Sequence, residues 1–170
     1  MMTTVDSRKS ALDGQELGVM LQYTVEAYKT FEKLAENLPN PMTALMFKQF
    51  AVDERESRDL LDMKIAAVGA NRVRTTLAGD LRFQDILEGD LSYRETAESL
   101  IARERSMEKK LVNLSRTASS ADRNLLVYLA ATKKAHIVEL DRELELLKVD
   151  RDWFKREDAE FRIVHGSRPE

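Results

Sequence analysis

Apolar residues recur at steps of three and four along four long stretches of the chain, which is the spacing of amphipathic α-helices. The pattern predicts helices over about 15–37, 41–68, 92–114 and 120–147. Proline, glycine and small polar residues gather mainly between these stretches. The chain is therefore expected to consist of long helices with few turns.

Residues at the predicted helix ends support these bounds. Asn40 suits an N-cap and Pro41 suits the first helical position, while Gly69 suits the C-terminal end of the same helix. Ser92 is followed three residues later by Glu95, which is the pattern of a capping box. Local chemistry and periodicity thus predict the same second and third helices.

The longest connection covers residues 69–91, between the second and third helices. It is too long for a tight turn between antiparallel neighbours and long enough to run along a bundle. Leu81 to Leu87 is expected to form a short helix or to anchor the connection by apolar packing. We predict an all-α four-helix bundle of two helix hairpins joined by a long crossover, with a short C-terminal helix.

The predicted organisation has three parts: an N-terminal tail over 1–14, the bundle over 15–147, and a C-terminal amphipathic helix and tail over 148–170. In the last part, Trp153, Phe154, Phe161 and Val164 give the segment from Asp152 to Val164 an apolar side. This segment is expected either to pack on its own bundle or to form a dimer contact. Spacing alone does not choose between the two.

Polar residues interrupt each apolar seam near its middle: Thr24, Glu54, Ser57, Glu104, Lys133 and His136. The pair in the second helix precedes the pair in the fourth by 79 residues, and Thr24 precedes Glu104 by 80. Near-equal offsets indicate an internal helix-pair repeat. All six side chains are expected inside the bundle, where charged groups need a partner or a metal. Thr24 and Ser57 are also expected to hydrogen-bond carbonyls of their own helices.

Composition narrows the classes of function. With 27 Lys and Arg against 30 Asp and Glu, the net charge of −3 gives no basic footprint for nucleic acid. The absence of cysteine excludes disulfides, thiolate zinc sites and iron–sulfur clusters. No stretch resembles a membrane span or a signal peptide, so we expect a cytoplasmic protein that binds no membrane. Five methionines are expected to fill the core: Met20, Met42, Met46, Met63 and Met107.

Three stretches resemble the rubrerythrin branch of the ferritin-like superfamily: Tyr23–Ala35, Phe50–Ser57 and His136–Leu144. The resemblance covers about residues 15–147 and implies a ferritin-like four-helix bundle. In that family two metal ions, usually iron, lie at the bundle centre. Two helices give one Glu each, and the other two give a Glu-x-x-His pair each.

Carried onto this chain residue by residue, the resemblance implies a degenerate ligand set. Glu54, Glu104 and His136 keep the family's ligand types. The other three ligand positions are occupied by Thr24, Ser57 and Lys133. An ammonium has three donors and can bridge two carboxylates, so we hypothesise that Lys133 replaces the metal charge.

Three interpretations of this cluster stay open. The first is a metal-free bundle used as a binding or structural module. The second is a single metal site formed by Glu54, Glu104 and His136, since two carboxylates and one His can hold iron or zinc. The third is a di-iron oxidase or peroxidase site with substitute ligands. No Gly-rich phosphate loop or G-x-S-x-G motif is present, and no catalytic residue is predicted.

The sequence therefore predicts a divergent rubrerythrin-like or ferritin-like protein with a degraded di-iron site. Its expected role is that of a non-catalytic binding, structural or assembly partner. The alternative is a non-haem mono-iron or di-iron oxidase, peroxidase or iron-handling protein. The expected cofactor is none or, in the alternative, iron. The expected partner is a second copy of the chain or another subunit of a protein complex.

Overall fold

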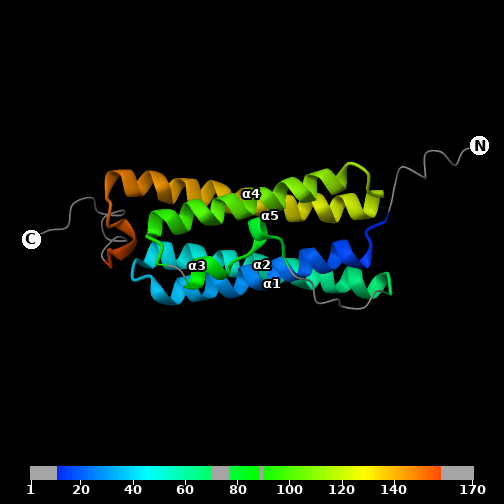
Figure 1. Cartoon of the computed structure of the whole chain (residues 1–170), viewed down its shortest axis with the longest axis horizontal. Helices are drawn as coiled ribbons and strands as arrows, with labels where there is room; N and C mark the ends of the chain where they lie inside the picture. The colour runs from blue at the N-terminus through cyan, green and yellow to red at the C-terminus, as the bar shows by residue number, and fades with distance from the viewer. Residues whose placement is uncertain (1–10, 70–76, 89, 158–170) are drawn as a thin grey trace, which may run out of the picture.

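The computed structural model describes residues 11–69, 77–88 and 90–157, and within these ranges all regular structure is helical, as the periodicity predicts. Four long helices lie alongside one another (Figure 1): α1 (Gly14–Asn37), α2 (Pro41–Ala67), α4 (Tyr93–Ser115) and α5 (Ser120–Val149). The shorter elements are η2 (Gly79–Leu81), α3 (Gln84–Glu88) and η3 (Trp153–Lys155).

The helix ends follow the predicted chemistry. The Asn40 side chain accepts hydrogen bonds from backbone N–H groups two and three residues on, at 2.9 and 3.1 Å, and so caps α2. Ser92 and Glu95 form the predicted capping box of α4. Gly69 follows α2 with a φ of +68°, a left-handed conformation that glycine adopts without a Cβ clash. A further capping box at Asp13 starts α1.

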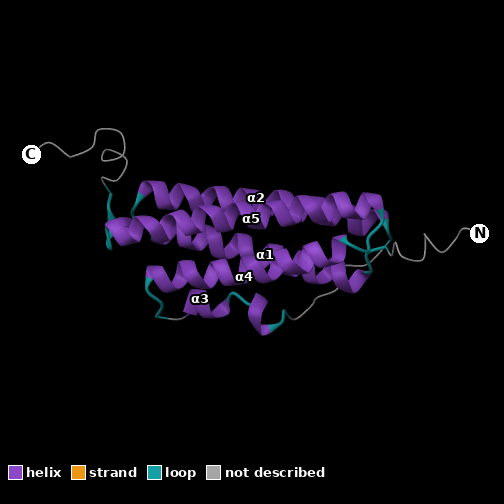
Figure 2. Ribbon diagram, turned by 90° about the horizontal axis from the view of Figure 1, so that it is seen from above, coloured by secondary structure: helices purple, strands orange, loops and turns teal. Residues whose placement is uncertain are grey.

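The long helices form two antiparallel hairpins, α1 with α2 and α4 with α5, and most helix–helix contacts lie inside these hairpins. Seen from above, α2 lies beside α5 and α1 beside α4 (Figure 2). Short connections close each hairpin, which fixes the antiparallel direction. No helix among the described residues is long and apolar enough to cross a membrane.

The described part of the long connection, residues 77–88, lies along the outside of α4 (Figure 2). As predicted, it contains a short helix and apolar anchors, because Leu81, Phe83 and Ile86 are buried. The Phe83 ring meets the Tyr23 ring of α1 edge-on, with centroids 5.1 Å apart. The connection therefore covers one side of the bundle centre.

The predicted seam of α1 is partly wrong. The spacing of three and four predicts a seam of seven residues: Leu17, Leu21, Thr24, Tyr28, Phe31, Ala35 and Leu38. Of these, Leu21 and Tyr28 are only half-buried, whereas Tyr23 and Ala27, outside the predicted seam, are fully buried. The buried face of α1 thus keeps Leu17, Thr24 and Phe31 and is wider than predicted, on the side of Tyr23 and Ala27. Phe83 of the connection packs against Tyr23 and so covers α1 on this wider side.

The expected C-terminal helix differs from the structure over its described part. Trp153–Lys155 form a 3₁₀ turn, and Arg156 is extended. Trp153 is buried, and the Asn40 N–H donates to the Phe154 carbonyl at 3.1 Å, so this part packs on its own bundle. The remainder of the expected helix, with Phe161 and Val164, lies outside the described residues.

The methionine prediction is correct only in part. Met20 and Met107 are buried, but Met42 and Met63 are exposed. Both exposed methionines lie on the outer side of α2, in line with other exposed apolar residues.

Candidate functional site

The six polar residues predicted on the seams meet inside the bundle, and each is at most 3% exposed. Thr24 comes from α1, and Glu54 and Ser57 come from α2. Glu104 comes from α4, and α5 carries the remaining two. Because every long helix contributes, this central cluster exists only when both hairpins are packed together.

The ammonium of Lys133 lies between two buried carboxylates. Its Nζ forms an ion pair with Oε1 of Glu54 and lies 4.0 Å from Oε2 of Glu104. The same nitrogen lies 5.0 Å from the centre of the Tyr23 ring, within the range of a cation–π contact. Lys133 therefore supplies a positive charge that both carboxylates share.

His136 links the buried carboxylate of Glu104 to Asp53, which lies at the edge of the cluster. Its Nδ1 lies 2.7 Å from Oε1 of Glu104, and its Nε2 lies 3.0 Å from Oδ2 of Asp53. The imidazole stacks on the Phe50 ring at 4.1 Å and meets the Phe31 ring edge-on at 5.7 Å. Two carboxylates on opposite ring nitrogens favour the doubly protonated imidazolium.

Tyr23 completes the shell around Glu104. Its hydroxyl donates to Oε2 of Glu104, so both oxygens of that carboxylate have buried partners. Burial, together with the charge of Glu104, raises the pKa of Tyr23 well above its usual value. Tyr23 therefore stays neutral and acts as a donor.

The pKa shifts follow from this packing. Burial raises the pKa of Glu54, because it opposes ionisation more than Lys133 favours it. Burial also opposes ionisation of Glu104, but Lys133 and His136 outweigh it, and the pKa of Glu104 is lowered.

The two cations shift in the opposite sense. Burial alone would lower the pKa of Lys133, yet the carboxylates of Glu104 and Glu54 raise it. In the same way Asp53 and Glu104 overcome burial and raise the pKa of His136 to about 9. The carboxylates of Glu54, Glu104 and Asp53 and the two cations thus offset one another's charge.

Thr24 and Ser57 bond to their own helices, as predicted. The Thr24 hydroxyl donates to the Met20 carbonyl at 2.8 Å, and the Ser57 hydroxyl donates to the Asp53 carbonyl at 3.1 Å. Neither side chain turns to the carboxylates. These two positions therefore offer no ligand toward the cluster.

A metal pair does not fit this arrangement. At two of the three substituted positions the hydroxyls of Thr24 and Ser57 bond carbonyls of their own helices. At the third, the ammonium of Lys133 pairs with the Glu54 carboxylate, which a metal would need as a ligand. A single ion has a possible donor set in Glu54, Glu104 and His136, whose ligand atoms lie within 4.8 Å of one another. The Oε2 atom of Glu54 is buried and has no hydrogen-bond partner among the described residues.

A second buried carboxylate lies near the end of the bundle, on α5. Glu143 accepts hydrogen bonds from Thr43 at 2.7 Å, Tyr93 at 2.8 Å and Trp153 at 3.1 Å. These donors come from α2, α4 and η3. Glu143 thus ties the turn after α5 to both hairpins through neutral donors.

A groove of about 370 Å³ between α2 and α5 leads toward the central cluster. Met42, Leu45 and Met46 line its outer part. Asp53 and His136 lie among its deeper lining residues. The half-exposed carboxylate of Asp53 therefore connects the buried imidazole with solvent.

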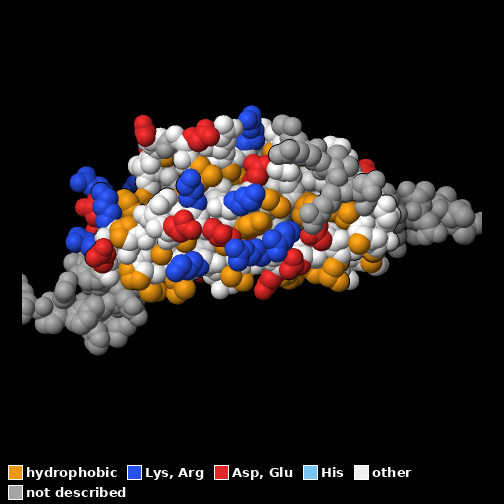
Figure 3. Space-filling model, turned by 90° about the horizontal axis from the view of Figure 1, so that it is seen from below, with side chains coloured by type: hydrophobic (Ala, Val, Ile, Leu, Met, Phe, Trp, Pro, Cys, Tyr) orange, Lys and Arg blue, Asp and Glu red, His pale blue; other side chains and the backbone are white. Residues whose placement is uncertain are grey.

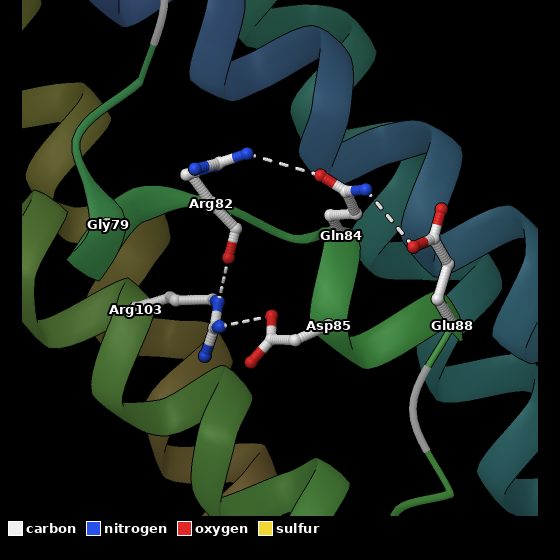
Figure 4. Close-up of a pocket in the computed structure, with 6 residues that line it drawn as sticks. All are labelled: Gly79, Arg82, Gln84, Asp85, Glu88 and Arg103. Carbon is white, nitrogen blue, oxygen red and sulfur yellow. Dashed lines mark hydrogen bonds and ion pairs between the residues drawn. The ribbon is translucent and has the colours of Figure 1, made fainter.

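A hollow of about 360 Å³ beside the connection has a structural role (Figure 4). Every nitrogen of the Arg103 guanidinium is engaged, by the Arg82 carbonyl, by Asp85 and by Ser99. Arg103 therefore holds the connection, including Phe83, against α4. Four of its five N–H groups are thus bonded within the fold.

Comparisons with known proteins do not identify this chain: no protein-family model matches it, and neither does any curated protein or solved structure. The structure itself therefore carries the functional interpretation.

The sequence predicted every charged member of the cluster core and missed part of its surroundings. Tyr23 was missed because it lies beside the predicted seam of α1, on the side that Phe83 of the connection covers. Glu143 was missed because its charge looks like that of a solvated helix surface. Its position seven residues after His136 placed it on the same side of α5, which was the available signal.

Proposed function

We propose that this chain is a divergent, rubrerythrin-like member of the ferritin-like superfamily in which Lys133 replaces the metal charge. In this proposal the protein is a cytoplasmic, non-catalytic binding, structural or assembly partner. The supporting observation is the buried ammonium between Glu54 and Glu104. A fixed ammonium supplies the positive charge that two carboxylates in a core require.

The charge count supports a core that needs no metal. Glu54 and Glu104 are balanced by Lys133 and His136, and Tyr23 fills the remaining position on Glu104. Introducing a divalent cation here would place it next to the ammonium of Lys133. Such a site is expected to repel metal unless Lys133 moves or loses its proton.

Metal analysis tests this proposal. Protein purified without chelator and reloaded anaerobically with ferrous iron is expected to hold no stoichiometric metal and to keep the same melting temperature in EDTA. The matched variant carries Thr24→Glu, Ser57→His and Lys133→Glu, which restores the six-ligand set and should bind about two iron ions per chain. One or two iron ions in the wild-type protein would contradict the proposal.

A second candidate function rests on the donor set that remains. A non-haem mono-iron protein would use Glu54, Glu104 and His136, whose ligand atoms lie within 4.8 Å of one another. In that case wild-type protein should bind one ferrous ion, and His136→Gln should abolish binding. If only Lys133→Met binds iron, the ammonium excludes metal and the first proposal is supported.

A further inference from the structure

The groove between α2 and α5 gives access to the central cluster from outside. Its volume is about 370 Å³, at the lower end of the range of small-molecule sites. The lining residues of α2 run from Met42 to Asp53, a length of about 16 Å at 1.5 Å per residue. Those of α5 run from Ala135 to Arg142. The groove is therefore long enough for an extended small molecule that lies along the two helices.

The outer part of the groove is apolar and adaptable. Met42 and Leu45 are exposed, and Met46 is half-buried beside them. Unbranched methionine side chains adjust to the shape of a ligand. Further in, the Phe50 ring is buried and stacks on the imidazole of His136, with centroids 4.1 Å apart. These walls suit an unbranched apolar chain.

The inner end of the groove is a carboxylate with unused acceptor capacity. The Asp53 side chain is 29% exposed. Its Oδ1 accepts from the Gln49 amide at 3.0 Å, and its Oδ2 lies 3.0 Å from Nε2 of His136. An ionised carboxylate has about four lone-pair positions, so Asp53 is able to accept further hydrogen bonds from the groove. An ammonium group has three donors and no acceptor, which matches this end.

The charge of the surroundings favours a cation at this end. The central cluster together with Asp53 contains three carboxylates and two cations: Asp53, Glu54, Glu104, Lys133 and His136. When all of them are ionised, one negative charge is in excess. Glu54 and Glu104 are completely buried, so a molecule in the groove meets this excess at Asp53. A positively charged group is therefore attracted to the inner end, and an anion is repelled.

The rim of the groove has no such excess. Arg142 lines the groove, and its guanidinium pairs with Glu139, another lining residue. Because α2 and α5 run antiparallel, Arg142 lies on the side of Met46, toward the outer part. The side formed by α1 and α2 also differs, because positive and negative side chains lie close together over it (Figure 3) and Glu32 pairs with Arg55 there. The groove is thus polarised, with negative charge at its inner end and apolar side chains outside.

We infer that the groove between α2 and α5 binds a small primary amine with an unbranched apolar tail. Its ammonium group donates to Asp53, and its tail lies along Phe50, Met46 and Leu45. The bond from an ammonium to a carboxylate is charge-assisted and stronger than one between neutral groups. The inference goes beyond the proposed function, because it assigns a ligand to a surface groove rather than a role to the core.

A titration of the full chain followed by heteronuclear NMR tests the inference. Hexylammonium chloride, added to metal-free protein at constant ionic strength, is expected to shift the backbone amides along the groove in a saturable way. The dissociation constant should lie below about 1 mM. Hexanol and hexanoate have the same tail, and each should bind at least about 10-fold more weakly. Hexamethylenediamine should also bind more weakly, because its second ammonium group would lie among the methionines beside Arg142.

Two variants locate the amine. Asp53→Asn should weaken hexylamine binding at least about 10-fold. Asp59→Asn is the matched control, because Asp59 is an exposed carboxylate of the same helix outside the groove. Ala135→Leu fills the groove without changing any charge and should weaken binding as well, whereas Ala131→Leu, at an exposed position outside the lining, should not. Circular dichroism confirms that each variant is folded.

Three results overturn the inference. One is the absence of saturable shifts along the groove. Another is hexylamine binding no tighter than that of hexanol, and the third is binding that Asp53→Asn and Ala135→Leu leave unchanged. The titration reads the groove and iron content reads the core, so a wild-type protein that takes up both iron and hexylamine contradicts only the proposed function. A protein that takes up neither contradicts only this inference.

Discussion

Two buried carboxylates in the same bundle are satisfied in opposite ways. Glu104, in the central cluster, has two charged partners besides the hydroxyl of Tyr23, since His136 lies 2.7 Å from one oxygen and Lys133 4.0 Å from the other. Glu143, near the end of the bundle, accepts from Thr43, Tyr93 and Trp153, which are neutral. Both are less than 5% exposed.

The difference shows how a buried charge depends on its surroundings. In the central cluster each charge is stabilised by another charge, so removing one member leaves its partner unpaired. At the end of the bundle a single charge is stabilised by three dipoles, and removing one dipole leaves the others in place. The first arrangement is therefore the more fragile of the two.

The largest expected effect comes from Lys133→Ala, which leaves Glu54 and Glu104 without their shared cation. The free energy of unfolding should fall by about 3–5 kcal/mol, measured by urea denaturation in metal-free buffer. Lys134→Ala is the control, because Lys134 is exposed on the same helix and its loss should leave stability unchanged. If Lys133→Ala unfolds at the wild-type midpoint, the charge-pairing account is wrong.

A second prediction distinguishes the two clusters by the pH dependence of the free energy of unfolding. The pKa of His136 is about 9 in the fold against an ordinary 6.5, so its contribution is complete below pH 6.5 and is lost as pH rises through 9. At 1.4 kcal/mol per unit, about 3 kcal/mol of stability should disappear over this window. Burial lowers this pKa, and the carboxylates of Asp53, Glu104 and Glu54, which surround the imidazole, outweigh burial and raise it.

Denaturation at several pH values measures this loss, and His136→Gln should flatten the curve between pH 6.5 and 9. The end cluster should not contribute there. Thr43 and Trp153 do not titrate, and burial together with Glu143 raises the pKa of Tyr93. A wild-type curve that stays flat up to pH 9 would show that His136 is neutral in the fold.

The smallest effect is expected from Glu143→Gln. The amide oxygen still accepts from part of the donor set, so the free energy of unfolding should fall by only about 1–2 kcal/mol. Urea denaturation measures it, with Glu145→Gln as the exposed control on the same helix. A loss as large as that of Lys133→Ala would mean that neutral donors and charged partners are equivalent here.

The sequence predicted the helices well because their ends carry local chemistry, such as Asn40 before Pro41 and Ser92 before Glu95. It predicted Lys133 and His136 inside because a polar residue on an apolar seam is a strong signal. It could not predict the partners of Glu143, since three elements far apart in the chain bring them together. Tyr23 was missed for a similar reason, because the crossover residue Phe83 helps to turn it inward.

The division into two hairpins has a consequence for the order of folding. Because most helix–helix contacts lie inside α1–α2 and α4–α5, each hairpin can assemble while Glu54 and Lys133 are still hydrated on separate surfaces. These charges meet only when the hairpins join, a step that we expect to follow the formation of each hairpin. Stabilisation gained that late acts on the unfolding rate rather than on the folding rate. The buried ammonium is therefore expected to lower the unfolding rate by slowing the separation of the two hairpins.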